Sequence, residues 1–483
     1  MAPGYKEESY LILQPGSYRT LVKLGLEDPL GLPSHSIESK VYRKKSNIES
    51  SNDNNSEPDF YSITPVEGYE EIYPIVAGRI KDVKGLQFFI KSIITSLITK
   101  NENGINPSNS DITSFESINL LLVQSSTRWN PFSIESIINY LFESINLNSI
   151  SLVPIELCSM FSYGSISNAL IIDIGYEKSE ILPIIDYQLY SPSKKVIDKG
   201  GSSINQNLIK LLPKFNNDQI EILKKSSIFE CLSEEDAKKS FYGMEGLIEN
   251  LDSINNNEDE DDDLDGIEKD DGILDIATIV TSEKSTRELL DETNKKLKKK
   301  GEQEKKKKNS ELESNNFYDF DGNLLTVGKE RFQGCNELID QLVFNIYHSL
   351  NKIPDLKKRQ DCYDNIIITG QTSKIKGFKE KIIFHLFNNY IVLTDNKLLQ
   401  PQSQFRNDVR TVDDSTISQV PRHLKLVPKI EYFSEWKKNG FEDCSFLGAQ
   451  ILSKQVFNSN SELCLTRDNY NENGPMTIWN ICL

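Results

Sequence analysis

The sequence predicts an α/β fold interrupted by long polar insertions. Apolar strand-like runs alternate with segments whose apolar residues recur at helical spacing, which is typical of that class. Two of the runs, Ile171–Gly175 and Ile366–Gly370, end in an acidic or polar residue and a glycine, where a backbone can approach a phosphate closely. Asp321-Gly322 separates aromatic and apolar residues, as in a hairpin turn, and a helix is expected after it.

The first part of the chain predicts a hairpin, a strand and two helices. The apolar run Tyr10–Leu26 is divided by Pro15-Gly16, which favours a hairpin. Ser133 is the expected N-cap of the second helix. The other expected elements are a buried strand at Leu120–Val123 and helices at Leu86–Lys100 and Ile134–Ile145.

The later part repeats this alternation. Residues Ile166–Asp186 predict two strands joined at Gly175, and a helix that follows is expected to stop at Pro213. Further on, the expected elements are a buried strand at Ile366–Ile368, a helix at Phe378–Phe387 and a compact α-rich piece at Tyr432–Leu483.

Composition excludes several classes of function. The 483 residues carry a net charge of −17, which argues against autonomous DNA binding because phosphate contacts need a basic surface. No apolar run approaches the ~18 residues needed to span a membrane, and no secretion signal is recognisable, so we expect a soluble intracellular protein. Seven scattered cysteines without a CxxC pair, with only four histidines, predict reduced structural thiols and no metal site.

Three segments are expected to lie outside the packed core. Residues 47–59 are rich in Ser and Asn and predict a flexible loop, and residues 394–429 form a second polar insertion. Residues 251–316 hold an acidic block, Glu258–Asp271, and a lysine block, Lys295–Lys308, which predicts a charged and largely disordered insertion. The lysine block is either a solvated tail or a nuclear-import signal.

Several stretches outside these insertions resemble the actin family. The pattern D-G-x-x-x-T-x-G-x-E-R-F, which begins at Asp321, is similar to an actin strand–turn–strand element. Four further stretches resemble actin segments: the run WNPFSIESIINYLFESINLNSISLVP from Trp129, Cys158–Gly164, Phe446–Leu452 and Thr466–Pro475. The resemblance implies an actin-like ATPase fold, in which two duplicated ribonuclease-H-like domains with four subdomains close around a nucleotide.

The same resemblance implies domain boundaries. One lobe, with subdomains 1 and 2, would comprise residues 1–165 and 430–483. The other lobe, with subdomains 3 and 4, would comprise residues 166–250 and 317–393. The insertion at 251–316 would interrupt this second lobe, and the insertion at 394–429 would follow it.

Other stretches resemble the actin-related proteins of fungal SWI/SNF- and RSC-type chromatin remodellers: Phe215–Lys239, Lys284–Glu292 and Tyr432–Phe457. This likeness implies a scaffold subunit that pairs with a second actin-related protein. The pair would sit on the helicase–SANT-associated helix of the remodelling ATPase, with a small accessory subunit, in the nucleus. The alternatives are an active actin-like ATPase and a dynactin-type filament end-cap.

The nucleotide-binding loops that the resemblance implies are incomplete. In the first loop Gly16 and Ser17 remain, but Gln14 replaces the metal-side aspartate and Tyr18 adds bulk. Leu21 stands where the phosphate-binding lysine belongs, and Lys23 could substitute if the loop slips. In the second loop, Asp173 and Gly175 remain.

The second loop also carries Tyr176 and Glu177, and Glu177 would repel a triphosphate unless a cation intervened. Ile155 and Glu180 replace the glutamine and histidine that orient the attacking water. In the adenosine loop Gly370 and Thr372 remain, but Gln371 and Ile375 replace a glycine and an aromatic residue. Residues that remain to hold a nucleotide are Gly16, Ser17, Asp173, Gly175, Gly370 and Thr372.

We therefore expect no catalytic residue, no metal site and no cofactor, with weak ATP binding left open. Asp173 is either a ligand of a metal-bound water or a strand-end carboxylate satisfied by neighbouring backbone N–H groups. The family's cleft for amphipathic helices would be lined here by Phe161, Gly164, Ile166, Leu447, Ile451 and Leu452. The alternative is that these are core residues of the C-terminal lobe.

Overall fold

The computed structural model describes residues 9–26, 28, 30–45, 60–103, 115–164, 166–243, 308–391, 421, 423–458 and 463–481. The predicted loop at 47–59 and most of the insertions at 251–316 and 394–429 lie outside these residues. The chain divides into a larger unit, Met1–Cys231 with Asp319–Asn323 and Glu330–Leu483, and a smaller one, Leu232–Tyr318 with Leu324–Lys329. The predicted lobe boundaries stay predictions.

The first sheet of the larger unit has six strands in the order β18-β10-β9-β1-β2-β3. The predicted hairpin is confirmed, because β1 pairs antiparallel with β2 up to Pro15 opposite Thr20. β9 pairs parallel with both β1 and β10, as expected when helices connect the strands. The strands are β1 (Tyr10–Pro15), β2 (Arg19–Leu24), β3 (His35–Glu38), β9 (Asn119–Gln124), β10 (Ser149–Pro154) and β18 (Leu465–Thr466).

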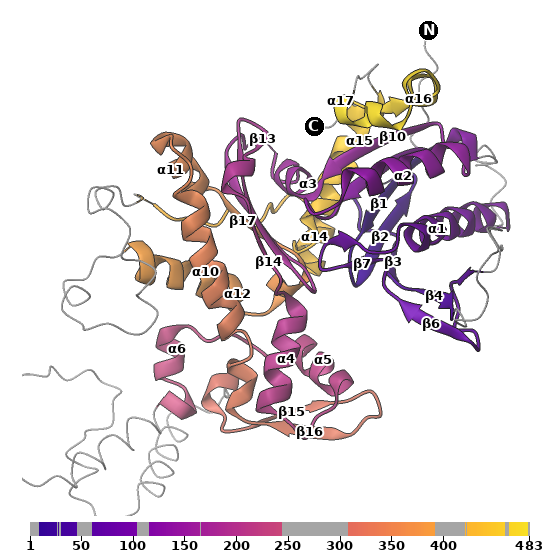
Figure 1. The fold of residues 1–483 in the computed structure, drawn as a ribbon. Coiled ribbons are helices and arrows are strands. Elements are labelled where there is room, and N and C mark those ends of the chain that lie inside the picture. The colour runs from indigo at the N-terminus through magenta and orange to yellow at the C-terminus, as the bar shows by residue number, and fades with distance from the viewer. Residues whose placement is uncertain are drawn as a thin grey trace, which may run out of the picture. The chain divides into compact units, whose positions relative to one another are not determined.

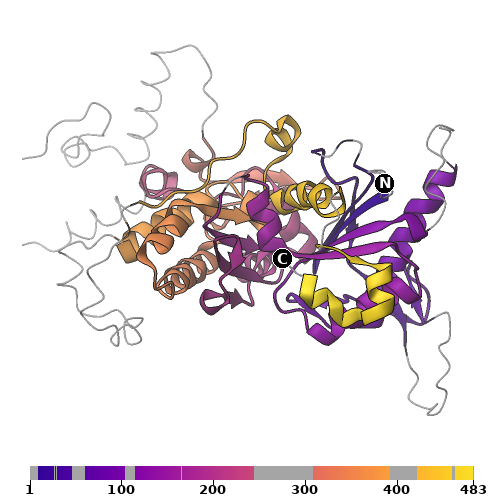
Figure 2. The ribbon, with the colours of Figure 1, turned by 90° about the horizontal axis from the view of Figure 1, so that it is seen from above.

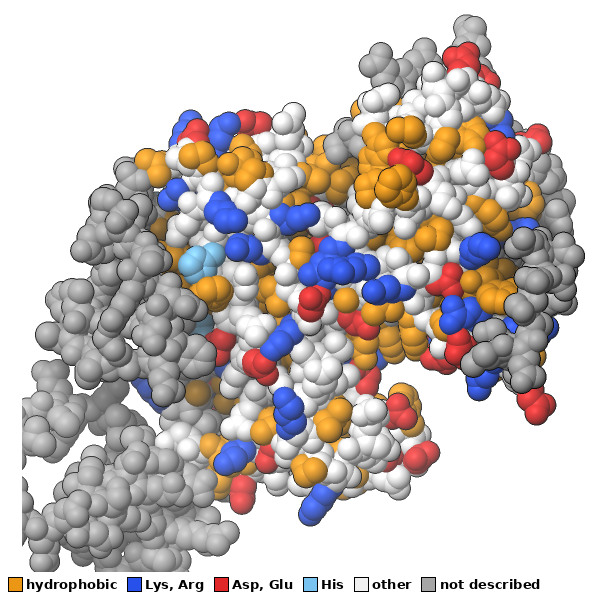
Figure 3. Space-filling model, in the orientation of Figure 1, with side chains coloured by type: hydrophobic (Ala, Val, Ile, Leu, Met, Phe, Trp, Pro, Cys, Tyr) orange, Lys and Arg blue, Asp and Glu red, His pale blue; other side chains and the backbone are white. Residues whose placement is uncertain are grey.

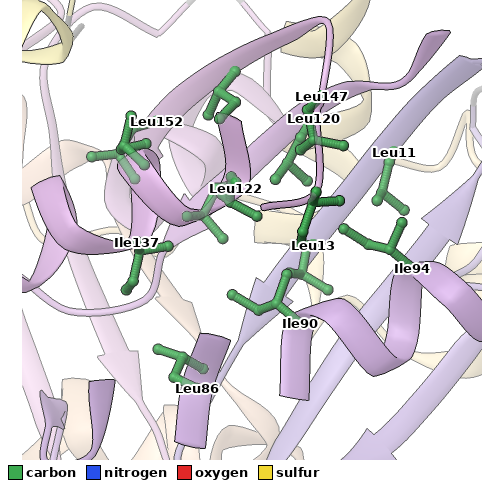
Figure 4. Packing of buried hydrophobic residues seen from close by; sticks show 14 of the residues in the cluster. Leu11, Leu13, Leu86, Ile90, Ile94, Leu120, Leu122, Ile137, Leu147 and Leu152 are labelled. Atoms are coloured by element: carbon green, nitrogen blue, oxygen red, sulfur yellow. The ribbon is translucent and has the colours of Figure 1, made fainter. Parts of the chain in front are cut away.

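Helices cover both faces of this sheet because its strands are apolar on both sides. Along β1, Leu11 and Leu13 join one core cluster, whereas Tyr10 and Ile12 join another, as the two-residue period of a strand requires. The first cluster includes α1 (Val83–Asn103) and α2 (Pro131–Glu143), and Figure 4 shows its leucines and isoleucines packed together. The second includes α3 (Ile155–Phe161) and α15 (Cys444–Asn458).

The second sheet contains the order β13-β12-β11-β17, with β14 paired to β12. Its strands also bury both faces: Ala169 and Ile171 of β11 join the cluster of α3 and α15, whereas Leu170 and Ile172 face a third cluster. The strands are β11 (Ala169–Ile174), β12 (Ser179–Ile185), β13 (Gln188–Leu189), β14 (Lys195–Ile197) and β17 (Ile366–Thr369). The outer helices of this cluster include α4 (Gly201–Leu211), α10 (Asn336–Leu350), α11 (Leu356–Asp364) and α12 (Phe378–Leu386).

Helices α3 and α15 form a shared layer between the two sheets (Figure 1 and Figure 2). They cross so closely that a Cβ atom on Gly448 would lie 1.7 Å from the carbonyl oxygen of Cys158. Only glycine fits at this crossing. The layer therefore fixes the spacing of the two sheets whose strand ends surround the site described below.

The end of the described chain returns to the first sheet. β18 pairs antiparallel with β10, and Tyr470 of α16 (Arg467–Asn473) stacks on Phe142 of α2 with ring centroids 4.4 Å apart. The Tyr470 hydroxyl also donates to Asn139 of α2. Beside α2 lies α17 (Ile478–Ile481), where Figure 3 shows hydrophobic side chains gathered on the surface.

The remaining elements of the larger unit are short. They are β4 (Val41–Lys44), β5 (Tyr61–Ser62), β6 (Tyr69–Ile72), β7 (Ile75–Val76), β8 (Arg79–Ile80), α5 (Asn217–Lys225) and α14 (Ser434–Asn439). The smaller unit contains α6 (Glu234–Lys238) and the hairpin of β15 (Asn315–Tyr318) and β16 (Leu324–Val327). No helix among the described residues has the length and apolar character needed to cross a membrane.

Two local predictions need correction. The N-cap of α2 is Asn130, not Ser133: the Asn130 side chain accepts a hydrogen bond from the Phe132 N–H, and Pro131 occupies the first helical position. The turn around Asp321-Gly322 is a five-residue loop, in which Gly322 has a φ of +80°. The Asp319 side chain accepts from the backbone N–H groups of Asp321 and Asn323, which closes the longer loop.

Gly448→Val should destabilise the protein by more than about 2 kcal/mol, because a side chain at this crossing overlaps the backbone of α3. Denaturant unfolding of the full chain measures the loss. Gln455→Val is the matched control, since it places the same residue at an exposed position of the same helix. Equal stability of the two variants would contradict the close crossing.

Candidate functional site

A cavity of about 720 Å³ lies in the larger unit, where the β1–β2 turn and the ends of β11 and β17 come together. Two contacts hold these loops close. The Thr372 hydroxyl donates to the carbonyl oxygen of Gly175 at 3.0 Å, and Gly370, with a φ of +91°, has no room for a Cβ beside the carbonyl of Ile174. All six residues predicted to face a nucleotide line this cavity: Gly16, Ser17, Asp173, Gly175, Gly370 and Thr372.

Residues that replace the family's expected ones tie the cavity walls to each other. Arg19 forms a salt bridge of 2.6 Å with Asp443, which also accepts from the side-chain amide of Gln371 at 2.7 Å. The Gln14 amide bonds to the Ser445 hydroxyl at 3.1 Å. Gln14 and Gln371, which sequence reasoning treated as losses, therefore connect two loops to the start of α15.

Two tyrosines face each other from the first and second loops. The rings of Tyr18 and Tyr176 lie 4.7 Å apart, and both residues line the cavity. Lys225 lies over the ring of Tyr18 and Lys224 over that of Tyr176. Both lysines also pair with Glu221, Lys224 at 2.6 Å and Lys225 at 3.1 Å. The predicted bulk of Tyr18 is thus part of an aromatic and charged cluster.

A buried lysine lies at the inner end of the cavity. The Lys178 ammonium is 3.1 Å from the carboxylate of Asp173 and 2.8 Å from that of Glu180. All three residues are buried. Glu180 is held from its other side by the hydroxyls of Ser126, at 2.8 Å, and Thr127, at 3.0 Å.

The electrostatics of this cluster favour a charged pair. Burial acts to lower the pKa of Lys178, but Glu180 and Asp173 outweigh it and raise that pKa above its ordinary value. Burial acts to raise the pKa of Glu180, but Lys178 and the two hydroxyl donors outweigh it and lower that pKa. Burial raises the pKa of Asp173, with Lys178 opposing the shift. Lys178 and Glu180 therefore form the ionised core of the cluster.

Sequence reasoning missed Lys178, although the register of the sheet contains a signal for it. β11 and β12 pair with Asp173 directly opposite Glu180, which would place two like charges side by side. Lys178 and Glu180 are two residues apart, so their side chains share a face. Had the pairing of Asp173 with Glu180 been predicted from the sequence, a cation between the two acids would have been expected as well.

Glu156, in the first turn of α3, is a second buried group that the sequence did not single out. Its side chain is fully buried, and neither carboxyl oxygen has a hydrogen-bonding partner among the described residues. Burial raises its pKa well above the ordinary value, and the negative charge of Glu180 raises it further. Both effects favour the protonated, neutral form of Glu156 in the folded protein.

Three side chains make contacts other than those that the sequence suggested. Lys23 does not substitute for the missing phosphate-binding lysine, because its ammonium bonds to the carbonyl of Asp28 at 2.6 Å and to Gln450 at 2.9 Å. Glu177 accepts from the backbone N–H of Ala77 at 2.6 Å and is not among the residues that line the cavity. Asp173 is satisfied by the Lys178 ammonium rather than by backbone N–H groups.

The magnesium ion that an actin-like fold implies does not fit these residues. A divalent cation at the Asp173 carboxylate would compete with the Lys178 ammonium, which contacts its Oδ2 atom at 3.1 Å. Among the described residues, no group of three or more His, Cys, Asp or Glu side chains is arranged to hold a metal. The positive charge at this position is supplied by the chain itself.

The six residues predicted to line a partner-helix cleft divide into two groups. Leu447 and Leu452 are buried in the core between the two sheets, so for them the alternative of a core role is correct. Phe161, Ile166 and Ile451 are half-buried and pack against that core. Phe161 also lies 6.2 Å from the ring of the exposed Tyr187. Gly164 is exposed, and nothing lies within 4 Å of its Cβ position.

Comparisons with known proteins agree with this architecture. The family model described as Actin matches residues 5–482. The chain is also similar to a protein of Schizosaccharomyces pombe (strain 972 / ATCC 24843) named "SWI/SNF and RSC complexes subunit arp9". The two are 24% identical over 542 aligned residues, which cover 99% of each chain.

Glu156→Gln should stabilise the protein, and the gain should grow as the pH rises. The carboxyl is protonated when folded but ionises when unfolded above its ordinary pKa of 4.5, so wild-type stability falls from that pH toward the raised folded-state pKa. The glutamine variant removes this loss, which grows by about 1.4 kcal/mol for each pH unit between the two pKa values.

Urea unfolding at pH 5 and pH 8 measures the effect. Glu380→Gln, at an exposed position of α12, is the control and should change stability little at either pH. A gain for Glu156→Gln that is equal at both pH values would show that the carboxyl is not held neutral.

Proposed function

Because the chain belongs to the actin family, we propose that it is a non-catalytic scaffold subunit of a nuclear chromatin-remodelling complex. The fission-yeast relative, whose name describes a subunit of SWI/SNF and RSC complexes, supports this proposal through an alignment that covers nearly all of both chains. The observation that carries the non-catalytic part is the buried Lys178–Glu180 pair. It stands where a working ATPase would need a metal and a positioned water.

The geometry of the cavity argues against hydrolysis. Phosphoryl transfer depends on an oriented nucleophile and on cations that stabilise the transferred group. Ile155 lines the cavity and has no polar side-chain atom with which to hold a water. Glu180 is occupied by Lys178, Ser126 and Thr127. Neither replacement residue is free to orient water, so a nucleotide in the cavity would not be cleaved.

An actin-like fold that does not hydrolyse ATP still has surfaces that can bind partner proteins. We assign the partner-helix contact to the half-buried residues Phe161, Ile166 and Ile451, with Gly164 leaving open space beside them. An amphipathic helix docks by burying its apolar face against such a surface. The proposed ligand is the helicase–SANT-associated helix of the remodelling ATPase, shared with a second actin-related protein and a small accessory subunit.

The purified full chain, assayed without its partners, should release no phosphate from Mg-ATP above the protein-free background. Actin assayed under the same conditions supplies the positive control. Magnesium-dependent turnover that follows this chain through purification would refute the non-catalytic role.

Ile451→Asp should weaken binding of the helicase–SANT-associated helix at least roughly tenfold, because it places a charge at the apolar contact. Titration calorimetry measures the loss: the helix peptide is titrated into this chain, wild type or variant, purified together with the second actin-related protein. The control is Ile209→Asp, which alters a partly exposed isoleucine on α4. Melting temperatures of both variants verify folding, and equal affinities would reject the assigned surface.

A further inference from the structure

The side chains of Lys178 and Glu180 together contact three segments that are far apart in the sequence. Asp173 and Glu180 come from β11 and β12 of the second sheet, whereas Ser126 and Thr127 follow β9 of the first. The hydrogen-bonded chain from Lys178 through Glu180 to the two hydroxyls therefore connects the ends of both sheets.

The turn between β7 and β8 is the third segment. A Cβ on Gly78 would lie 2.7 Å from Cδ of Lys178 and 2.6 Å from the Ser126 hydroxyl, so this turn packs directly on the lysine stem. Ala77, in the same turn, donates its N–H to the carboxylate of Glu177. The lysine is thus enclosed by the backbone of one segment and by the carboxylates of another.

We propose that Lys178 is a built-in counter-ion that replaces a divalent cation and holds the cavity walls together without metal. Three observations carry this. The ammonium contacts two acids that strand pairing places opposite each other. Its side chain is buried, so it neutralises the two acids at a place where water screens their repulsion weakly. The fully buried Glu156, whose carboxyl has no hydrogen-bonding partner among the described residues, interacts electrostatically with the same cluster.

The proposal goes beyond the scaffold role and does not depend on any partner. Removing the ammonium would leave Asp173, Glu180 and Glu156 as a buried set of carboxyl groups, and oxygen ligands of this kind are what hard divalent cations prefer. A metal ion could then restore the lost positive charge. The same ion should not stabilise the wild-type protein, because the Lys178 side chain already supplies the cation of its cavity.

The test compares the melting temperature of the full-length Lys178→Ala variant and of the wild type, in EDTA and across a Mn²⁺ titration. We expect the variant to melt lower in EDTA and to recover by roughly 2–4 °C more than the wild type as Mn²⁺ saturates. The wild type carries the same acidic block, Glu258–Asp271, so Mn²⁺ binding there affects both proteins equally.

Lys225→Ala is the matched control, since it removes a lysine that lines the cavity but does not contact Asp173 or Glu180. Its melting temperature should respond to Mn²⁺ as the wild type's does. Adding Asp173→Asn and Glu180→Gln to Lys178→Ala should abolish the extra rise in melting temperature that Mn²⁺ produces. If Lys178→Ala does not fold in EDTA, refolding yield with and without Mn²⁺ is measured for it and for Lys178→Gln. Equal Mn²⁺ responses of wild type and variant, or yields that Mn²⁺ does not raise, would overturn the proposal.

Discussion

A lysine enclosed between two carboxylates at the meeting point of two sheets is the constraint on which the rest of the cavity depends. Strand pairing forces Asp173 and Glu180 into opposition, and a buried pair of like charges is unfavourable without a cation. Lys178 resolves this conflict within one hairpin. The same ammonium then positions Glu180 to accept from the loop after β9, which links the second sheet to the first.

The other cavity contacts follow the same pattern, with groups that would ordinarily serve a ligand engaged by the chain itself. Arg19 pairs with Asp443, and Lys224 and Lys225 pair with Glu221. The two facing tyrosines add an aromatic contact between the loops. These internal partners support the proposed structural role, in which an actin-family fold keeps its architecture without a bound nucleotide.

The strands and helices were largely predictable because their signals are local. The split of Tyr10–Leu26 by Pro15-Gly16 and the apolar stripe of α2 specify their elements within a few residues, and all six proposed cavity residues line one cavity. Several of the failures involve side chains whose partners lie far away in sequence. Lys23 is held by Gln450, and the burial of Leu447 and Leu452 depends on two sheets packing against one helix. Neither local spacing nor residue type reveals such partners.

The return of α15 and β18 to the first sheet has a consequence for synthesis. β1 emerges from the ribosome long before α15, yet its Gln14 contacts Ser445 at a separation of 431 residues. The sheet's β18 edge and the layer over β1 are thus completed only after more than four hundred further residues have been made. Until then the apolar faces of β1 and β10 need temporary cover, which predicts that the nascent chain engages chaperones throughout its elongation.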